Sequence, residues 1–493
     1  MTARKPRLHL SKSLFMRGLQ CPKSLYFDRY HPELRDEIAV SQERVVQSGT
    51  DVGMLARDLH QGGVEVPFAG LTVRRQLQRT AAEITRGTTT IYEAAFTHND
   101  VFVKVDILHK GTRGWELNEV KGTTAVKDVH VDDVALQYYV LAGAGIDLVK
   151  ASLVHLNNQY VRKGGLEVDK LFSSVDITQP VRAKQSAVKA DVERLKGILK
   201  GNMPGFDIGE HCGDPYPCDF HQHCWQHIPE DSVFDLKQRG ARPFDFYRRG
   251  IIHLKDVPSD EVSGAQLMQL EAYLNKSEYV DREQVREFLD TLWYPLYFLD
   301  FETVMPAIPP YDGMRPYQQL PFQYSLHYLE REGSELRHRE YLAEPNIDPR
   351  GEIAESLVRD IPEEACVIAY NASFEMSRLG DLAGYLPRYK RRIDLMIDNT
   401  RDLIIPFRSR YVYHWQMKGS ASQKAVLPAL VPELSYEGMA VGHGGEAMDA
   451  YFAMCASDDP GEVAGIRAAL LKYCKLDTLG MVKIVERLRN LIR

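Results

Sequence analysis

The sequence predicts a chain of two α/β domains. Its 493 residues are more than a single hydrophobic core usually holds, so two large domains are expected. Strand-like segments and helical segments occur in both halves. An irregular, cysteine-bearing segment over residues 209–225 separates the halves. We therefore expect domains over residues 1–228 and 293–493, joined by a helical connector over residues 229–292.

The composition is that of an ordinary cytoplasmic protein. Hydrophobic residues make up 44% of the chain and charged residues 26%, as in a typical globular protein. Seven cysteines, an odd number, argue against a secreted disulfide framework and favour a reducing compartment. Neither a run of about 18 apolar residues nor an apolar signal segment is present, so no membrane span or signal peptide is expected.

The net charge of −7 restricts any nucleic-acid surface to local basic regions. Residues 1–30 are one candidate, because a group of basic residues stands there against the single acid Asp28: Arg4, Lys5, Arg7, Lys12, Arg17, Lys23 and Arg29. Charge alone fits a solvated basic arm equally well.

Helices are expected at the start of the chain. The first is capped by Ser11 or Ser13 and ends before Pro22, which is well suited to begin the next helix. Cys21 then lies at a helix junction. A further helical stretch spans about residues 38–59 and is followed by His60.

Four cysteines point to a metal site. Cys212, Cys218 and Cys224 are evenly spaced in GEHCGDPYPCDFHQHCW, and Cys21 is the only other cysteine before residue 366. Structural zinc usually takes cysteine pairs about two to four residues apart, and no such pair occurs here. An iron–sulfur cluster is therefore favoured, with zinc and ordinary buried cysteines as the alternatives. Three later cysteines have apolar contexts typical of packing residues: Cys366, Cys455 and Cys474.

Two strand-like segments of the first half, VFVKVDIL (101–108) and WELNEVKG (115–122), are predicted to form a hairpin. If Lys110 pairs with Trp115, Asp106 falls opposite Glu119. Glu119 and Lys121 share a face because strand side chains repeat every two residues. Two carboxylates and an ammonium in this arrangement can hold a hard divalent cation beside a phosphate. A purely structural ion pair is the alternative.

The first half resembles a RecB-like PD-(D/E)XK nuclease. The resemblance rests on Asp106, Glu119 and Lys121, on a following helix with Gln137, Tyr138 and Tyr139, and on one early and three late cysteines. The similarity covers about residues 8–228 and is to the iron–sulfur branch that includes CRISPR-adaptation exonucleases and AddB-type repair nucleases. It implies a restriction-endonuclease-like mixed sheet and a 4Fe–4S cluster on Cys21, Cys212, Cys218 and Cys224. It also implies metal binding by Asp106 and Glu119, catalytic assistance by Lys121, and contact of Gln137 with DNA or the attacking water.

One position departs from that family. A metal-binding histidine usually follows a helical glycine by one turn, whereas Gly53 is followed there by Arg57. His60, or Glu93 in the strand-like segment IYEAAF, is a possible replacement.

Between the halves, the segment PFDFYRRGIIHLKDVP is expected to be a small helical or hairpin connector. Its aromatic and basic residues suit either stacking on single-stranded bases or packing between domains: Phe244, Phe246, Tyr247, Arg248 and Arg249.

The second half begins with the strand YFLDFETV (297–304), which carries Asp300 and Glu302 on one face. Buried strands rarely hold two acids without a cation that neutralises them. Strands 322–329 and 335–342, a helix over about residues 350–359, strand 366–371 and a helix from Phe374 follow. The predicted order is three strands, helix, strand, helix.

Near the C-terminus, Tyr473 and Asp477 lie four residues apart, on one helix face. With Asp300 and Glu302 they resemble the DnaQ-like, RNase H-fold exonucleases of the DEDD class, in the variant that uses tyrosine. The resemblance implies an RNase H-like mixed sheet flanked by helices, with Asp300, Glu302 and Asp477 as metal ligands and Tyr473 positioning the nucleophile.

The remaining ligand of that class is expected four residues after Asn371. Glu375 stands there instead of an aspartate, and Asp394 is a second choice. The segments GSASQKAVLPALVP and YEGMAVGHGGEA resemble the region between motifs in a bacterial and archaeal family that fuses both nuclease modules.

The resemblance implies a cytoplasmic DNA nuclease with two active sites, dependent on Mg²⁺ or Mn²⁺ and acting in repair, recombination or anti-phage defence. The C-terminal site would be a 3′–5′ exonuclease on single strands or ends. No GxxxxGK[ST] phosphate loop is present, so unwound DNA or a partner helicase is expected. The alternatives are an RNA-directed exonuclease and a non-catalytic nucleic-acid-binding subunit of a repair or defence complex.

Overall fold

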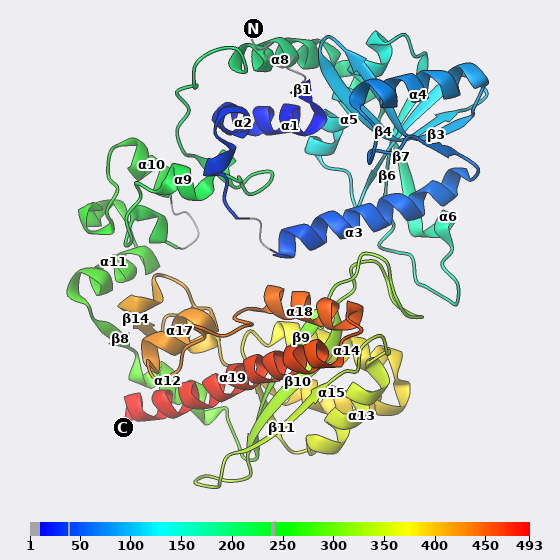
Figure 1. The fold of residues 1–493 in the computed structure, drawn as a ribbon. Coiled ribbons are helices and arrows are strands. Elements are labelled where there is room, and N and C mark those ends of the chain that lie inside the picture. Colours follow the sequence, from blue (N-terminus) through cyan, green and yellow to red (C-terminus); the bar gives the residue numbers. More distant parts are fainter. Residues whose placement is uncertain (1–9, 38–39, 238–241) are drawn as a thin grey trace. The chain divides into compact units, whose positions relative to one another are not determined.

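The computed structural model describes residues 10–37, 40–237 and 242–493 (Figure 1). They divide into two compact units. The first contains the chain up to His227 together with Pro306–Gln318, and the second contains Ile228–Met305 and Gln319–Arg493. Both units are α/β with mixed sheets. Arg4, Lys5 and Arg7 of the candidate basic arm lie outside the described residues.

The first unit is built on a seven-stranded sheet of order β2-β3-β4-β5-β6-β7, with β1 paired to β4. Only β1–β4, β2–β3 and β5–β6 are parallel pairs. The strands are β1 (Leu10–Ser11), β2 (Val64–Glu65), β3 (Thr90–His98), β4 (Val101–Lys110), β5 (Trp115–Lys121), β6 (Leu148–Leu156) and β7 (Phe172–Asp176). The helices are α1 (Lys12–Gln20), α2 (Pro22–Tyr30), α3 (Val40–Ala56), α4 (Val73–Arg86), α5 (Asp128–Gly143), α6 (Val168–Leu171), α7 (Thr178–Ala183), α8 (Gln185–Ile198) and α9 (His221–Trp225).

Local sequence signals place the first helices and the hairpin as expected. Ser11 caps α1 by accepting a hydrogen bond from the amide of Leu14, and Pro22 begins α2 directly after Cys21. In the β4–β5 hairpin, Lys110 pairs with Trp115, which confirms the predicted register.

Apolar side chains pack on both faces of this sheet. One cluster joins Val103 of β4 to Val134 of α5 and Val192 of α8. A second cluster joins Ile107 of β4 to Val52 of α3. The sheet is therefore covered by helices on both faces, as the burial of its strands requires.

The second unit contains a five-stranded sheet of order β11-β10-β9-β12-β13. Strand β10 is antiparallel to β9 and β11, whereas β9, β12 and β13 are parallel. The strands are β8 (Glu278–Val280), β9 (Leu296–Val304), β10 (Leu320–Leu329), β11 (Arg337–Leu342), β12 (Cys366–Ala369), β13 (Thr400–Asp402) and β14 (Val412–His414), with β8 and β14 forming a separate pair.

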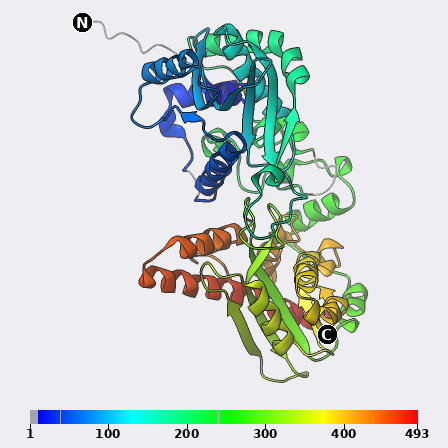
Figure 2. The ribbon, with the colours of Figure 1, turned by 90° about the vertical axis from the view of Figure 1, so that its right-hand side faces the viewer.

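The helices of this unit are α10 (Pro243–Arg248), α11 (Ala265–Asn275), α12 (Arg282–Asp290), α13 (Arg350–Asp360), α14 (Ser373–Tyr385), α15 (Lys390–Asp398), α16 (Ile405–Arg408), α17 (Gln423–Leu430), α18 (Gly444–Ala456) and α19 (Pro460–Ile492). The predicted order of three strands, helix, strand, helix is confirmed by β9, β10, β11, α13, β12 and α14. Helix α19, red in Figures 1 and 2, lies across β9 and β10. Phe298 packs toward α19 and Leu299 toward α13 and α14, so both sheet faces are buried.

The expected connector over residues 229–292 belongs to the second unit rather than standing apart. Val285 and Phe288 of α12 share an apolar cluster with Phe298 of β9, which explains the difference. In α10, Phe246 is buried and Phe244 packs against Phe234.

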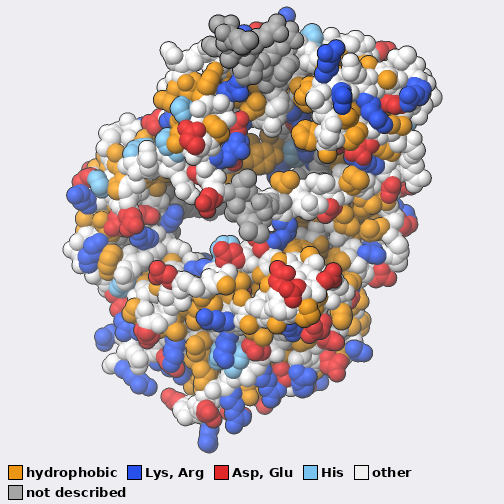
Figure 3. All heavy atoms as spheres, in the orientation of Figure 1, with side chains coloured by type: hydrophobic (Ala, Val, Ile, Leu, Met, Phe, Trp, Pro, Cys, Tyr) orange, Lys and Arg blue, Asp and Glu red, His pale blue; other side chains and the backbone are white. Residues whose placement is uncertain are grey.

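The surface carries charges of both signs. On the face shown in Figure 3, Lys and Arg side chains are interspersed with Asp and Glu. Among the described helices, none is long and apolar enough to cross a membrane.

Candidate functional site

The first carboxylate site lies where the β4–β5 hairpin meets α5. The Lys121 Nζ atom lies 2.7 Å from Glu119 Oε1 and 2.6 Å from Asp133 Oδ2. Gln137 Nε2 donates to Glu119 Oε2 at 2.7 Å, and Asp106 Oδ2 accepts from the amide of Val120 at 2.8 Å. The four predicted residues Asp106, Glu119, Lys121 and Gln137 are thus gathered in one place.

Two further residues belong to this site and were not predicted. Lys12, the first residue of α1, places its Nζ 2.7 Å from Glu119 Oε1 and 3.5 Å from Asp133. Asp133 also accepts from Gln137 Nε2 at 2.9 Å. The helical spacing of four between Asp133 and Gln137 was a usable signal. No sequence signal pointed to Lys12, because its partner Glu119 lies 107 positions along the chain.

Charge and burial set the protonation of the first site. Burial and the neighbouring charge of Glu119 raise the pKa of Asp106 to about 7. Burial alone would raise the pKa of Glu119 as well, but the Lys12 and Lys121 ammoniums hold it well below its usual value. Asp106 and Glu119 fit a hard divalent cation by donor type. Such an ion would share Glu119 with two lysines already bonded to it.

The proposed replacements for the missing histidine have other partners. Arg57 lies 3.7 Å from Glu93, and Glu93 pairs with Lys104 at 3.0 Å. The His60 ring packs in a tilted arrangement against that of His109, with 4.4 Å between centroids. Arg57, Glu93 and His60 thus make these contacts away from the group of residues around Glu119.

The four predicted cysteines line one small pocket in the first unit. Cys21 is the N-cap of α2, where its Sγ accepts from the amide of Ser24 at 3.3 Å. Ser24 Oγ lies 3.7 Å from Cys218 Sγ. Burial raises the pKa of the Cys21 thiol to about 11, and burial also raises that of Cys224. Fold contacts therefore bring Cys21 to the cysteine loop of residues 209–225.

Side chains of α1 fasten that loop. Gln20 Nε2 donates to the carbonyl oxygens of His211 at 2.8 Å and Tyr216 at 2.6 Å. Arg17 bonds to Asp219. Two basic residues of the candidate arm, Lys12 and Arg17, are thus engaged inside the first unit.

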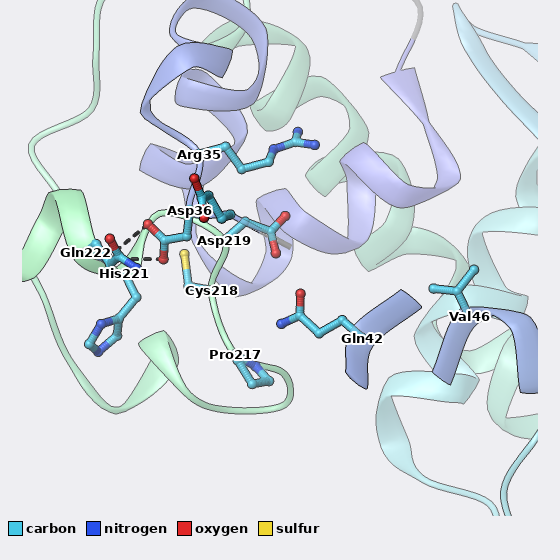
Figure 4. A pocket seen from close by; sticks show the side chains of 10 residues that line it. Arg35, Asp36, Gln42, Val46, Pro217, Cys218, Asp219, His221 and Gln222 are labelled. Carbon is cyan, nitrogen blue, oxygen red and sulfur yellow. Dashed lines mark hydrogen bonds between the residues drawn. The ribbon is translucent and has the colours of Figure 1, made fainter. Parts of the chain in front are cut away.

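A more open pocket adjoins the cysteines (Figure 4). Both oxygens of Asp36 accept from the amide of Gln222 at 3.2 Å, which fixes one wall. Cys218 lines this pocket as well as the cysteine pocket, so the two pockets adjoin at this residue.

The cysteine spacing is wider than zinc requires. Thiolates around one zinc ion lie about 3.8 Å apart, given Zn–S bonds of about 2.3 Å in a tetrahedron. In the part of the chain that the structure describes, no three of these sulfurs lie within 4.8 Å of one another. The donor set of four cysteines, one at the N-cap of α2 and three in residues 209–225, fits an iron–sulfur cluster better than zinc.

The second carboxylate site lies on the second sheet. Asp300 and Glu302 project from β9, Glu375 comes from the first turn of α14, and Asp477 from α19. Glu302, Glu375 and Asp477 are buried, and Asp300 is partly exposed. Ligand atoms of Asp300, Glu302 and Cys474 lie within 4.8 Å of one another. The predicted substitute Glu375 lies outside these three ligand atoms but near enough for its charge to act on Asp300 and Glu302.

The carboxylates of this site oppose one another's ionisation. Burial, and then the charge of Asp477, raise the pKa values of Asp300 and Glu302 well above normal. Burial raises the pKa of Glu375 to about 8 and that of Asp477 to about 6. Within the described residues, none of the four forms an ion pair with Lys or Arg, and Glu375 Oε2 has no hydrogen-bond partner. Divalent cations fit this donor set because they would neutralise it.

Tyr436 is a residue of this site that sequence reasoning missed. Its hydroxyl donates to Asp477 Oδ1 at 2.6 Å. The ring of Tyr473 lies 6.2 Å from that of Tyr436, and Lys424 Nζ lies about 5.5 Å from both ring centroids. Tyr436 opens the segment YEGMAVGHGGEA, so the signal was present, but its contact with Asp477 was not predictable.

Asp394 does not join this group. It pairs with Lys390 at 2.7 Å on an exposed face of α15.

A family model described as a domain of unknown function (DUF2779) matches residues 297–422. The matched region contains Asp300, Glu302 and Glu375 and ends before Tyr436 and Asp477. No match to this chain was found among curated proteins.

Proposed function

We propose that this protein is a metal-dependent nuclease with two active sites, one in each unit. The observation that carries the proposal is the group of four carboxylates in the second unit, none of which forms a direct ion pair with Lys or Arg among the described residues. Buried carboxylates of this number are unfavourable unless cations neutralise them. Phosphodiester hydrolysis is one chemistry that acidic groups with divalent cations serve.

Asp300, Glu302, Glu375 and Asp477 would hold the cations of the second site. Divalent cations lower the pKa of bound water and neutralise charge on a phosphate. The Tyr436 hydroxyl, which donates to Asp477, and the hydroxyl of Tyr473, whose ring lies beside that of Tyr436, would orient water on this side. The resemblance to the DEDD class favours removal of nucleotides from a 3′ end in an RNase H-like fold.

Lys424 supplies positive charge beside the second site. Burial lowers its pKa, while the nearby carboxylates of Asp477 and Glu302 oppose that shift. Its ammonium also donates to the carbonyl oxygen of Gly442 at 2.7 Å, which holds it in place. A phosphate entering the site would meet this cation, and electrostatic attraction of that kind favours binding of a nucleic-acid strand.

The first site is proposed as a RecB-like nuclease centre in a restriction-endonuclease-like fold. Asp106 and Glu119 would hold a cation, and Lys121 would contact the phosphate. The pairing of Glu119 with Lys12 and Lys121 makes this site less dependent on a cation for charge balance than the second site. The four cysteines would bind a 4Fe–4S cluster that ties α1 to the loop of residues 209–225.

Degradation of an end-labelled single strand of DNA by anaerobically purified protein, in Mg²⁺ or Mn²⁺, tests the proposal. Glu119→Ala/Lys121→Ala should abolish cleavage by the first site, and Asp300→Ala/Glu302→Ala cleavage by the second. The exposed pair Glu167→Ala/Lys170→Ala is the matched control for the first variant. Exposed Glu332→Ala/Glu335→Ala is the control for the second.

A matched RNA strand identifies the polymer that each site prefers. Binding of the strand without cleavage in either metal would refute the catalytic proposal and favour a nucleic-acid-binding subunit. Equal losses in the site variants and their exposed controls would refute the assignment of residues.

A further inference from the structure

Cys474 lies inside the second carboxylate site. It is fully buried on α19, one residue after Tyr473 and three before Asp477. Its Sγ lies 3.5 Å from Asp300 Oδ2 and 3.8 Å from the Asp300 carbonyl oxygen. The sequence predicted a packing residue here, but the sulfur faces carboxylate oxygens.

The spacing matches two ligands of one cation. Zn–S bonds of about 2.3 Å and Zn–O bonds of about 2.0 Å at a tetrahedral angle place sulfur and oxygen about 3.5 Å apart. The distance between Cys474 Sγ and Asp300 Oδ2 is 3.5 Å. A thiol hydrogen bond explains that distance equally well, and the shared face of β9 brings Asp300 and Glu302 together. All three residues nevertheless offer ligand atoms within 4.8 Å of one another, close enough to converge on one cation.

Glu375 provides a second, independent observation. It is only 4% exposed, and its Oε2 has no hydrogen-bond partner in the described part of the chain. Its charge acts on both Asp300 and Glu302, so its carboxylate lies near this group, although outside the set of three ligand atoms that lie within 4.8 Å of one another. A buried carboxylate oxygen without a partner is unfavourable, and a cation would satisfy it.

We propose that Cys474 is a thiolate ligand of a cation shared with Asp300 and Glu302, beside the unpartnered carboxylate of Glu375, and that this position takes a zinc-class ion in preference to Mg²⁺. Thiolate donors favour zinc, cobalt and cadmium, whereas Mg²⁺ prefers oxygen donors alone. When the sulfur–metal bond forms, the thiol proton leaves to solvent and no oxidation state changes. Asp300, which is partly exposed, gives the ion a route from solvent.

The inference rests on the metal-binding part of the proposed function, so its test measures binding rather than cleavage. Full-length protein is loaded with ¹¹³Cd²⁺, and ¹¹³Cd NMR is used because thiolate ligands shift the resonance strongly downfield. We expect a resonance of mixed sulfur and oxygen ligation, separate from any all-sulfur signal of the four cysteines in the first unit. Cys474→Ser should remove it and weaken Zn²⁺ binding at this site at least tenfold.

Two further variants make the result decisive. Cys455→Ser changes a half-buried cysteine of the same unit and should keep the resonance. Asp300→Asn keeps the thiol but removes a ligand charge, so it should shift or abolish the resonance even if Cys474→Ser misfolds. A mixed-ligand resonance that persists unchanged in either Cys474→Ser or Asp300→Asn would overturn the inference, as would its absence from the wild type.

These outcomes separate the inference from the nuclease proposal. A protein that cleaves DNA in Mg²⁺ but shows no thiolate-bound cadmium in the second unit would refute only the inference. A protein that binds cadmium through Cys474 and leaves both DNA and RNA intact would refute only the nuclease.

Discussion

Replacement of Glu375 by glutamine should stabilise the metal-free protein. Burial raises the pKa of Glu375 from 4.5 to about 8, so the folded protein holds this carboxyl protonated at pH 7. The unfolded chain ionises it. Folding therefore costs free energy that depends on pH, and Glu375→Gln removes this cost because an amide does not ionise.

The size of this stabilisation follows from the difference between the solution pH and the pKa of Glu375 in the unfolded chain. At pH 7 that difference is about 2.5 units, which corresponds to about 3 kcal/mol. Because the folded pKa is raised, the cost is absent below about pH 4.5, grows as the pH rises and levels off near pH 8. A gain of about 3 kcal/mol in a domain of this size corresponds to a Tm higher by about 6–12 °C.

Calorimetric unfolding of full-length protein with a chelator, at pH 5 and pH 7, measures the effect. The gain should appear in the transition of the second unit at pH 7 and nearly vanish at pH 5. Exposed Glu355→Gln is the control and should change neither transition. Added Mn²⁺ should stabilise the wild type more than Glu375→Gln. An equal gain at both pH values, or none beyond the control, would refute the electrostatic reasoning.

Three other variants probe the two units. Lys12→Ala removes a cation bonded to the buried Glu119 and should lower the free energy of unfolding of the first unit by about 2 kcal/mol in urea denaturation. The loss is smaller than for a fully buried pair because Lys12 is partly exposed. No loss, or an equal loss in Lys12→Arg, would contradict this prediction. Cys21→Ser should abolish the visible absorption of an iron–sulfur cluster in anaerobically purified protein, and an unchanged spectrum would contradict the cluster assignment. Tyr436→Phe removes the hydrogen bond that holds down the pKa of Asp477, so that pKa should rise above about 6. The acidic limb of the pH–rate profile of the second site should then move to higher pH, and an unmoved limb would contradict the role of Tyr436.

Local signals in the sequence determined much of the fold. The serine and proline at the starts of α1 and α2 act within one helical turn, and the β4–β5 register depends on a four-residue loop. Alternation along β9 placed Asp300 and Glu302 on one face. Such features could be predicted because the interactions that fix them span only a few residues.

Contacts between distant segments were decided by the tertiary structure. Lys12 reaches Glu119 across 107 positions, Tyr436 reaches Asp477 across 41, and Cys474 reaches Asp300 across 174. Periodicity shows which face of a helix or strand is buried but not which partner it meets. The sequence determined the helices and strands and most of the carboxylates of both sites. Only packing decided which lysine, tyrosine and cysteine side chains accompany those carboxylates. The physical reason is that side chains so far apart in the chain meet only when the core forms.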